Sequence, residues 1–274
     1  MTKIAVRDIS SPSNLLIKEI AALRLKKRRD ETGLFLVEGA RAILEALECG
    51  QAPKSLIYVR AARDNDIVAR LRARTIAAGG EALEVGPAIL EKLARKDNPQ
   101  SVLGVFEQRY ADLSGLEIGP GDVIVALEGV KDPGNLGTII RTIDAVAARG
   151  VILVGNTCDP YSVEAVRASV GSIFAVSMWR ADEALFAEFC GAFPGLIVGT
   201  ALQADTDYRA IDYPEPILLV MGAEQAGLTE SARGACKALV KLPMKGRADS
   251  LNLAVSTGVM LYHIENAQEM RKRR

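Results

Sequence analysis

The stretch L-E-G-V-K-D-P-G-N-L-G-T-I-I-R-T-I-D-A, residues 127–145, joins an apolar segment to a helical pattern through a loop rich in functional residue types. Before the loop, residues 122–127 (D-V-I-V-A-L) are a short apolar run with β-branched members, which suits a strand buried on both faces of a parallel sheet. After the loop, apolar side chains recur at helical spacing, and Asp132, Pro133, Gly134 and Asn135 supply turn and helix-start chemistry. The stretch therefore predicts a strand, a loop and a helix, with a functional site at the loop.

Two interpretations of the polar residues in this stretch are open. Asp132 or Asn135 can simply cap the helix, and Arg141, which lies off the apolar stripe, can be a solvated surface arginine. The string D-P-G-N-L-G-T-I-I-R-T, however, resembles the first motif of the SpoU/TrmH family of RNA ribose methyltransferases. That motif is N-x-G-x-x-x-R, and it is matched here by Asn135, Gly137 and Arg141.

Two later segments add to the resemblance. Residues 219–228, L-V-M-G-A-E-Q-A-G-L, are similar to the second motif of the family, at Gly222, Glu224, Gly227 and Leu228. Residues 242–258, L-P-M-K-G-R-A-D-S-L-N-L-A-V-S-T-G, match the third motif, at Pro243, Met244, Gly246, Ser250, Leu251 and Asn252. The three motifs occur in the family order, and the resemblance covers residues 123–264 firmly and residues 10–106 more loosely.

Length and composition set the class of protein. A chain of 274 residues that is 49% hydrophobic can bury one large core or two ordinary cores, and the usual domain length of about 100 to 200 residues favours two domains. Lys and Arg together number 34, as do Asp and Glu, so no global charge favours nucleic acid, although a local basic surface stays possible. The four cysteines form no C-x-x-C pair and His263 is the only histidine, so we predict neither a metal site nor a disulfide framework.

Targeting signals are not apparent in the sequence. The N-terminus has no continuous apolar core behind its charges, and no apolar run approaches the roughly 18 residues that a membrane span needs. We therefore expect a cytoplasmic protein without membrane insertion.

The order of apolar and helical patterns predicts two α/β domains. In the first, expected strands at residues 34–37, 56–59, 82–85 and 102–106 alternate with expected helices at residues 13–29, 40–49, 65–78 and 87–94. Residues 108–121 lose periodicity and gather glycine and proline, as a linker does. We accordingly divide the chain into a domain at residues 1–110, a linker at 111–121 and a domain at 122–274.

The second domain is expected to bind ligand at one edge of a parallel sheet. After the strand at 122–127, expected strands follow at residues 151–154, 196–200, 217–221 and 238–242, and expected helices lie within 159–174 and at 251–264. Each strand leads into a polar loop. Because ligands of open parallel sheets bind at the carboxyl ends of the strands, these loops are the expected walls of the pocket.

The first domain is similar to the L30e-like substrate-binding domain that precedes many SpoU-type catalytic domains, on the phrase G-L-F-L-V-E-G-A-R-A-I-L-E-A-L at residues 33–47. The resemblance implies that this domain selects the RNA. The candidate RNA-binding residues are Lys26, Lys27, Arg28, Arg29 and Arg41. A solvated helix face and an ordinary surface arginine are the alternative interpretation of these charges.

Other function classes fit less well. A dinucleotide-binding dehydrogenase needs G-x-G-x-x-G after the first strand, where this chain has D-P-G-N-L-G. Residues 222–227 have the glycine spacing of a phosphate-binding loop, but Leu228-Thr229 follows in place of Lys-Ser/Thr, so the lysine that would bind a β- or γ-phosphate is missing. A non-catalytic, ribosome-associated RNA-binding protein stays open, although such a protein has no need of the three motifs.

The resemblance implies an S-adenosyl-methionine-dependent RNA 2'-O-ribose methyltransferase, acting on ribosomal RNA or, as the alternative, on transfer RNA. It implies a SPOUT-type fold with a deep trefoil knot and a site completed across a homodimer. Cofactor-binding residues are expected at Thr200, Gly222, Leu242 and Leu251, and catalytic residues at Asn135, Arg141, Glu224, Ser250 and Asn252. For Leu242 and Leu251, an ordinary place in the core is the alternative.

The role of Arg141 has two interpretations. The family assigns the general base to this arginine, yet a guanidinium pKa above about 12 makes neutral arginine scarce. Arg141 either acts as a base assisted by a substrate phosphate, or binds that phosphate while Ser250, Asn252 or water takes the proton. Asn135 and Asn252 are then expected to orient the ribose, and Glu224 to orient Arg141 or Asn135.

Overall fold

The computed structural model describes residues 6–94 and 101–273, which form two compact units. The first unit comprises Met1–Gln108 and Tyr161–Ala175, and the second comprises Arg109–Pro160 and Val176–Arg274. The boundaries at residues 110 and 122 stay a prediction, and the sequence pattern carries no sign that Tyr161–Ala175 belongs with the first unit. Among the described residues, no helix has both the length and the apolar character that crossing a membrane requires.

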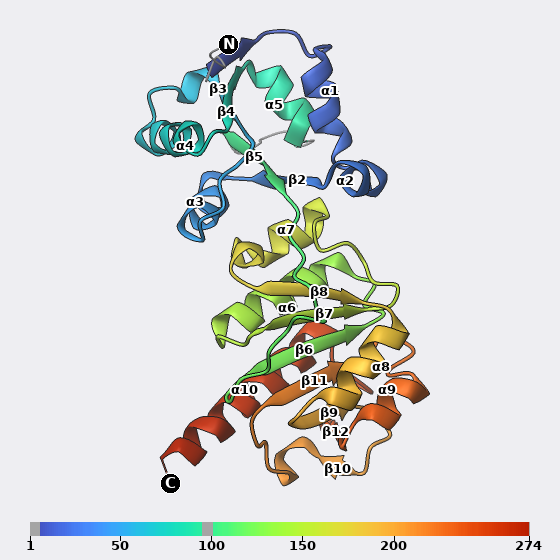
Figure 1. The fold of residues 1–274 in the computed structure, drawn as a ribbon. Helices are drawn as coiled ribbons and strands as arrows, with labels where there is room; N and C mark the ends of the chain where they lie inside the picture. The colour runs from blue at the N-terminus through green and yellow to red at the C-terminus, as the bar shows by residue number, and fades with distance from the viewer. Residues whose placement is uncertain (1–5, 95–100, 274) are drawn as a thin grey trace. The chain divides into compact units, whose positions relative to one another are not determined.

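The first unit is a five-stranded sheet with helices on both faces (Figure 1). The strand order is β1-β4-β3-β5-β2, in which β5 runs antiparallel to its two neighbours. The strands are β1 (Val6–Ile9), β2 (Leu34–Glu38), β3 (Ser55–Val59), β4 (Glu81–Val85) and β5 (Val102–Glu107). One face packs against α1 (Leu15–Ala22) and α5 (Pro87–Ala94), and the other against α3 (Ala40–Glu48) and α4 (Asp66–Ala77).

The first predicted helix, residues 13–29, is wrong as a single helix. The structure has α1 and then α2 (Lys26–Thr32), because Leu25 takes an extended conformation and ends the helical path. Arg29 explains the break: its side chain is 3% exposed and donates from one guanidinium nitrogen to Leu23 O at 2.9 Å and Arg24 O at 2.8 Å. The arginine thus satisfies carbonyls in the turn that helix continuation would otherwise satisfy.

Tyr161–Ala175 packs within the first unit through aromatic side chains. This segment contains α7 (Val163–Ser169) and the 3₁₀ turn η2 (Ser172–Phe174). The ring of Phe35 lies 4.5 Å from that of Tyr161, and the ring of Phe106 lies 4.8 Å from that of Phe174, centre to centre. Burial of these large rings favours packing of the segment within the first unit over packing with its neighbours in the sequence.

The second unit is a seven-stranded, all-parallel sheet in the order β10-β12-β9-β11-β6-β7-β8. Its strands are β6 (Val123–Glu128), β7 (Gly150–Val154), β8 (Ser177–Ala181), β9 (Leu196–Thr200), β10 (Thr206–Asp207), β11 (Ile217–Met221) and β12 (Ala238–Lys241). Every residue of β6, β7 and β11 is buried, as apolar strands of a doubly covered parallel sheet require. The predicted α/β fold class with a parallel C-terminal sheet is confirmed.

Helices cover both faces of this sheet. Helix α6 (Pro133–Ala145) packs against α10 (Leu253–Lys272) on one face, while α8 (Glu183–Ala192) and α9 (Glu230–Ala235) lie together on the other (Figure 1). The chain runs outward from β6 to β7 and β8 and then returns to β9, and β11 later inserts between β9 and β6. The sheet therefore has a switch in strand order at β6 and β11, which is where open parallel sheets bind ligands.

Candidate functional site at the carboxyl ends of the central strands

The loop after β6 is shaped by helix-capping chemistry. Asp132 is the N-cap of α6, and its side chain accepts a hydrogen bond from Asn135 N at 2.6 Å, while Pro133 occupies the first turn, where no backbone donor is needed. The predicted apolar face is buried, at Leu136, Ile139, Ile140 and Ile143. Because this face is held against the sheet, the side chain of Arg141 is left exposed on the other side of the helix.

Three of the predicted catalytic residues form one directional chain of hydrogen bonds. Asn252 donates from Nδ2 to Asn135 Oδ1 at 2.8 Å, and Asn135 donates from Nδ2 to Glu224 Oε1 at 3.1 Å. Asn252 is also the N-cap of α10, where its Oδ1 accepts from Ala254 N and Val255 N. This series of hydrogen bonds joins the loops after β6 and β11 to the start of α10. Of the two partners predicted for Glu224, Arg141 and Asn135, it is therefore Asn135 that Glu224 orients.

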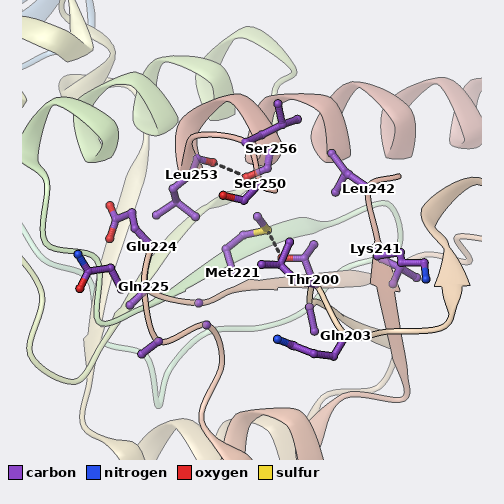
Figure 2. A pocket seen from close by; sticks show the side chains of 18 of the residues that line it. Thr200, Gln203, Met221, Glu224, Gln225, Lys241, Leu242, Ser250, Leu253 and Ser256 are labelled. Atoms are coloured by element: carbon purple, nitrogen blue, oxygen red, sulfur yellow. Dashed lines mark hydrogen bonds between the residues drawn. The ribbon is translucent and has the colours of Figure 1, made fainter. Parts of the chain in front are cut away.

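A pocket lies beside this chain, at the carboxyl ends of β9, β11 and β12 (Figure 2). All four predicted cofactor-binding residues line it, namely Thr200, Gly222, Leu242 and Leu251. Glu224 and Ser250 also line it, whereas Asn135, Arg141 and Asn252 do not. Leu251 is 40% exposed and Leu242 is half-buried, so neither is the ordinary core residue of the alternative interpretation.

The wall formed by residues 221–227 contains a tight loop closed by two glycines. A Cβ on Gly222 would lie 2.2 Å from the carbonyl carbon of Gly227, so only glycine allows this loop to close. Gly227 takes a positive φ of 67° and donates its N–H to Ala223 O at 2.9 Å. The glycines of the second motif therefore fold the loop back on itself and present its main chain to the pocket.

Several lining residues are not apparent from the sequence. Among them are Met221, Gln203, Gln225, Arg233, Lys241, Leu253 and Ser256, and Thr200 Oγ1 donates to the sulfur of Met221 at 3.4 Å (Figure 2). Arg233 of α9 donates to Gln203 Oε1 at 3.3 Å and to Leu228 O at 3.2 Å, which ties the loop after β9 to the loop after β11. No motif or spacing marks this arginine.

Cys158 lies near the motif loops but is not a nucleophile at neutral pH. Its N–H donates to Val130 O at 2.7 Å, so the loop after β7 lies beside the loop after β6. Burial, followed by the nearby carboxylate of Asp132, raises the pKa of the Cys158 thiol to about 12. The thiol stays protonated, and a cysteine-based mechanism has no support here.

The predicted RNA-binding residues of the first unit do not act as one group. Arg29 is a correction, because its buried guanidinium binds backbone carbonyls and cannot reach a phosphate. The others are accessible but paired on their own helices: Lys26 with Asp30, Lys27 and Arg28 with Glu31, and Arg41 with Glu45. These pairs cancel much of the local positive charge, so the cluster is less basic than its sequence indicates.

Comparison with known proteins agrees with this geometry. A family model described as the SpoU rRNA Methylase family matches residues 122–262, and one described as an MRM3-like substrate binding domain matches residues 14–104. The 23S rRNA (uridine(2479)-2'-O)-methyltransferase of Streptomyces viridochromogenes is 33% identical over 265 residues, which is 94% of this chain and 91% of the relative. The 23S rRNA (guanosine(2553)-2'-O)-methyltransferase RlmP of Bacillus subtilis is 27% identical over 94% of this chain and 99% of its own.

A solved structure is similar over almost the whole chain. The crystal structure of an AdoMet-bound rRNA methyltransferase from Sinorhizobium meliloti has a TM-score of 0.90 and 44% sequence identity, and covers 96% of this chain and 98% of its own. The order of strands, the motif residues gathered at one sheet edge and these full-length matches lead to one conclusion. The chain belongs to the SpoU rRNA methylase family.

Proposed function

We infer that the protein transfers the methyl group of S-adenosyl-methionine to a ribose 2'-hydroxyl of ribosomal RNA. The observation that carries this inference is the meeting of all four predicted cofactor residues with Glu224 and Ser250 in one pocket. The full-length relatives named above support ribosomal RNA over transfer RNA as the substrate. That substrate in turn implies a cytoplasmic protein.

The pocket suits the cofactor by its chemistry. Leu242, Met244, Leu251 and Leu253 offer apolar surface to an adenine ring, and the main chain of residues 221–227 offers backbone hydrogen-bonding groups to its edge. Gly222 lets this main chain fold into its tight loop, because a Cβ there would collide with the backbone of Gly227. When bound, S-adenosyl-methionine supplies a methyl group on a positively charged sulfur that an oxygen nucleophile can accept.

The protein must then orient the ribose and remove the proton of its 2'-hydroxyl. Both acceptor positions of Asn252 Oδ1 are used by Ala254 N and Val255 N, so its side chain has only an Nδ2 donor left to give. Asn252 is therefore an orienting donor, and the proton goes to Arg141, Ser250 or water. Asn135, held at both ends of its amide, presents its remaining N–H in a fixed direction.

Arg141 acts on the substrate from outside the pocket. Its side chain is exposed on α6 and does not line the pocket of its own chain. We propose that a second copy brings the two together, because α10 displays an exposed apolar stripe at Val255, Val259 and Tyr262, which are 52%, 36% and 55% exposed. Their spacing of four and three residues places them on one helix face, which a homodimer would bury.

Three further parts of the proposal rest on the family. The C-terminal segment forms a trefoil knot around the cofactor loops, the division into residues 1–110, 111–121 and 122–274 separates RNA selection from methyl transfer, and the L30e-like domain selects the RNA. The match of residues 14–104 to a substrate-binding domain supports the last part.

Methyl transfer from labelled S-adenosyl-methionine to purified ribosomal RNA, with transfer RNA as the control, tests the proposed function. Mapping of 2'-O-methyl sites in total RNA from cells with and without the protein identifies the nucleotide. Label found only in transfer RNA, or at a base in place of a ribose, would overturn the proposal.

A further inference from the structure

Glu128 is a buried carboxylate that none of the three motifs includes. It is the last residue of β6, is 9% exposed, and lies at the sheet edge that carries the cofactor pocket without lining the pocket. Within the described residues its carboxylate has no cation within 4 Å. A buried charge of this kind needs specific donors to balance the loss of water.

Thr229 supplies those donors. Glu128 Oε2 accepts from Thr229 N at 2.8 Å, and Oε1 accepts from Thr229 Oγ1 at 2.7 Å. The threonine hydroxyl must donate here, since a carboxylate can only accept, so its lone pair is free to accept from Ala232 N at 3.2 Å and cap α9. The carboxylate thus sets the direction of the hydroxyl and, through it, the start of α9, whose positive end it also faces.

Thr229 lies two residues after the stretch that forms one wall of the pocket, residues 221–227. The same stretch is bound near its middle by the hydrogen bond from Asn135 to Glu224. The two bonds differ in environment, because the Asn135 to Glu224 bond is exposed and the bonds from Thr229 to Glu128 are half-buried. Hydrogen bonds shielded from water hold geometry better, so Glu128 at the end of β6 holds this wall more firmly than Asn135 of α6 does.

We propose that Glu128 is a positioning residue for the cofactor: through Thr229 it fixes the loop of residues 222–228 in the conformation that binds S-adenosyl-methionine. This role rests on the proposed function. Loss of the carboxylate leaves every pocket side chain in place but lets the loop sample conformations that do not bind. Because affinity falls with the fraction of molecules in the binding conformation, the cofactor Kd and KM rise while kcat at saturating cofactor changes little.

The test compares four variants of the full chain with the wild type by calorimetric titration with S-adenosyl-methionine. Glu128→Gln keeps the shape but replaces an acceptor by a donor, and is expected to raise Kd about tenfold; Thr229→Val loses one of the two bonds and raises Kd about threefold to fivefold. Thr229→Ser keeps both donors and is expected to stay within about twofold of wild type. RNA affinity without cofactor is expected to be unchanged in all of them.

Asp182→Ala is the matched control for a purely structural effect. Asp182 caps α8 on the same sheet, accepting from Leu185 N at 2.8 Å, and has no part in the pocket. Its loss lowers the melting temperature as loss of the Thr229 cap does, but leaves the cofactor Kd at the wild-type value.

The outcomes distinguish failure of the role of Glu128 from failure of the proposed function. Wild-type Kd values in both Glu128→Gln and Thr229→Val overturn the role of Glu128. If Glu128→Gln fails to fold, the Thr229→Val and Thr229→Ser pair decides alone, and equal Kd values in that pair overturn the role. A wild-type chain that binds no S-adenosyl-methionine overturns the proposed function itself.

Discussion

The side-chain amide of Asn135 donates a hydrogen bond to Glu224 Oε1 at 3.1 Å, although the two residues lie 89 positions apart in the chain. The bond joins the first motif to the second across the switch in strand order between β6 and β11. The direction of this bond, and of the hydrogen bond from Asn252 to Asn135, predicts the effect of substituting these residues.

Asn135→Asp is expected to abolish the hydrogen bond to Glu224. The new carboxylate cannot donate, and two carboxylates at hydrogen-bonding distance repel each other. We expect the single-turnover rate to fall by roughly 100-fold, or about 2.7 kcal/mol in transition-state free energy, with cofactor affinity nearly unchanged. Rapid-quench methylation assays check the rate and calorimetry checks the affinity; a rate near wild type would show that the chain of amides is not needed.

Arg141→Ala is expected to abolish methyl transfer and to leave cofactor affinity unchanged, because Arg141 does not line the pocket. Arg141→Lys distinguishes its two candidate roles. A lysine still binds a phosphate as a point charge, so a measurable rate indicates phosphate binding, and no rate indicates a base or a bidentate contact. Wild-type turnover in Arg141→Ala would refute both roles.

The basic residues of α2 are expected to have two different roles, RNA binding and stabilisation of the fold. Changing Lys26, Lys27 and Arg28 together to Ser is expected to raise the RNA Kd and to lower the slope of log Kd against log salt by about 0.7 to 0.9 for each phosphate that the helix no longer neutralises. Arg29→Ala is instead expected to lower the free energy of unfolding by about 1–3 kcal/mol, since it strands buried carbonyls. Filter binding checks the RNA affinity and its salt slope, and urea unfolding checks the stability. An unchanged salt slope would show that α2 does not contact the RNA and that another surface selects it.

Glu84 predicts a pH dependence of stability in the first unit. Burial alone would raise the pKa of this carboxyl, but hydrogen bonds from Arg63, Tyr58 and Arg60 outweigh burial and lower the pKa below its ordinary value of 4.5. A lowered folded-state pKa stabilises the protein above about pH 4.5 and loses that stabilisation as pH falls through the lowered value. We expect urea midpoints of Glu84→Gln to vary less with pH than those of the wild type as the pH falls below about 4.5.

The apolar stripe of α10 predicts the oligomeric state. Val259→Asp places a charge in the centre of the stripe and is expected to convert a homodimer into monomers and to remove activity with it. Leu15→Asp is the control, because Leu15 is also exposed, at 71%, but lies on α1 of the first unit and not on the pocket. Light scattering on the full chain checks both; a monomeric wild type, or a dimeric Val259→Asp, would refute the interface.

Local pattern was enough to predict the main elements. The strands Leu196–Thr200 and Ile217–Met221 and the helix Pro87–Ala94 have the predicted bounds, because each is an apolar run or helical stripe with clear turn residues beside it. Among the described residues, three strands and two α-helices were not predicted: β1, β8, β10, α8 and α9. Those strands are short or mixed in polarity, and they are strands because a neighbouring strand pairs with them.

The sequence by itself determined the residue types of the site, since the glycines, asparagines and Arg141 occur at motif spacings that can be read without coordinates. Only the tertiary structure decided which of them meet. Glu224 binds Asn135 and not Arg141, Arg29 turns inward to a helix break, and Glu128 finds Thr229 across 101 residues. The physical reason is that hydrogen-bond partners are chosen by strand order and burial, which bring distant loops to one sheet edge and which no local spacing encodes.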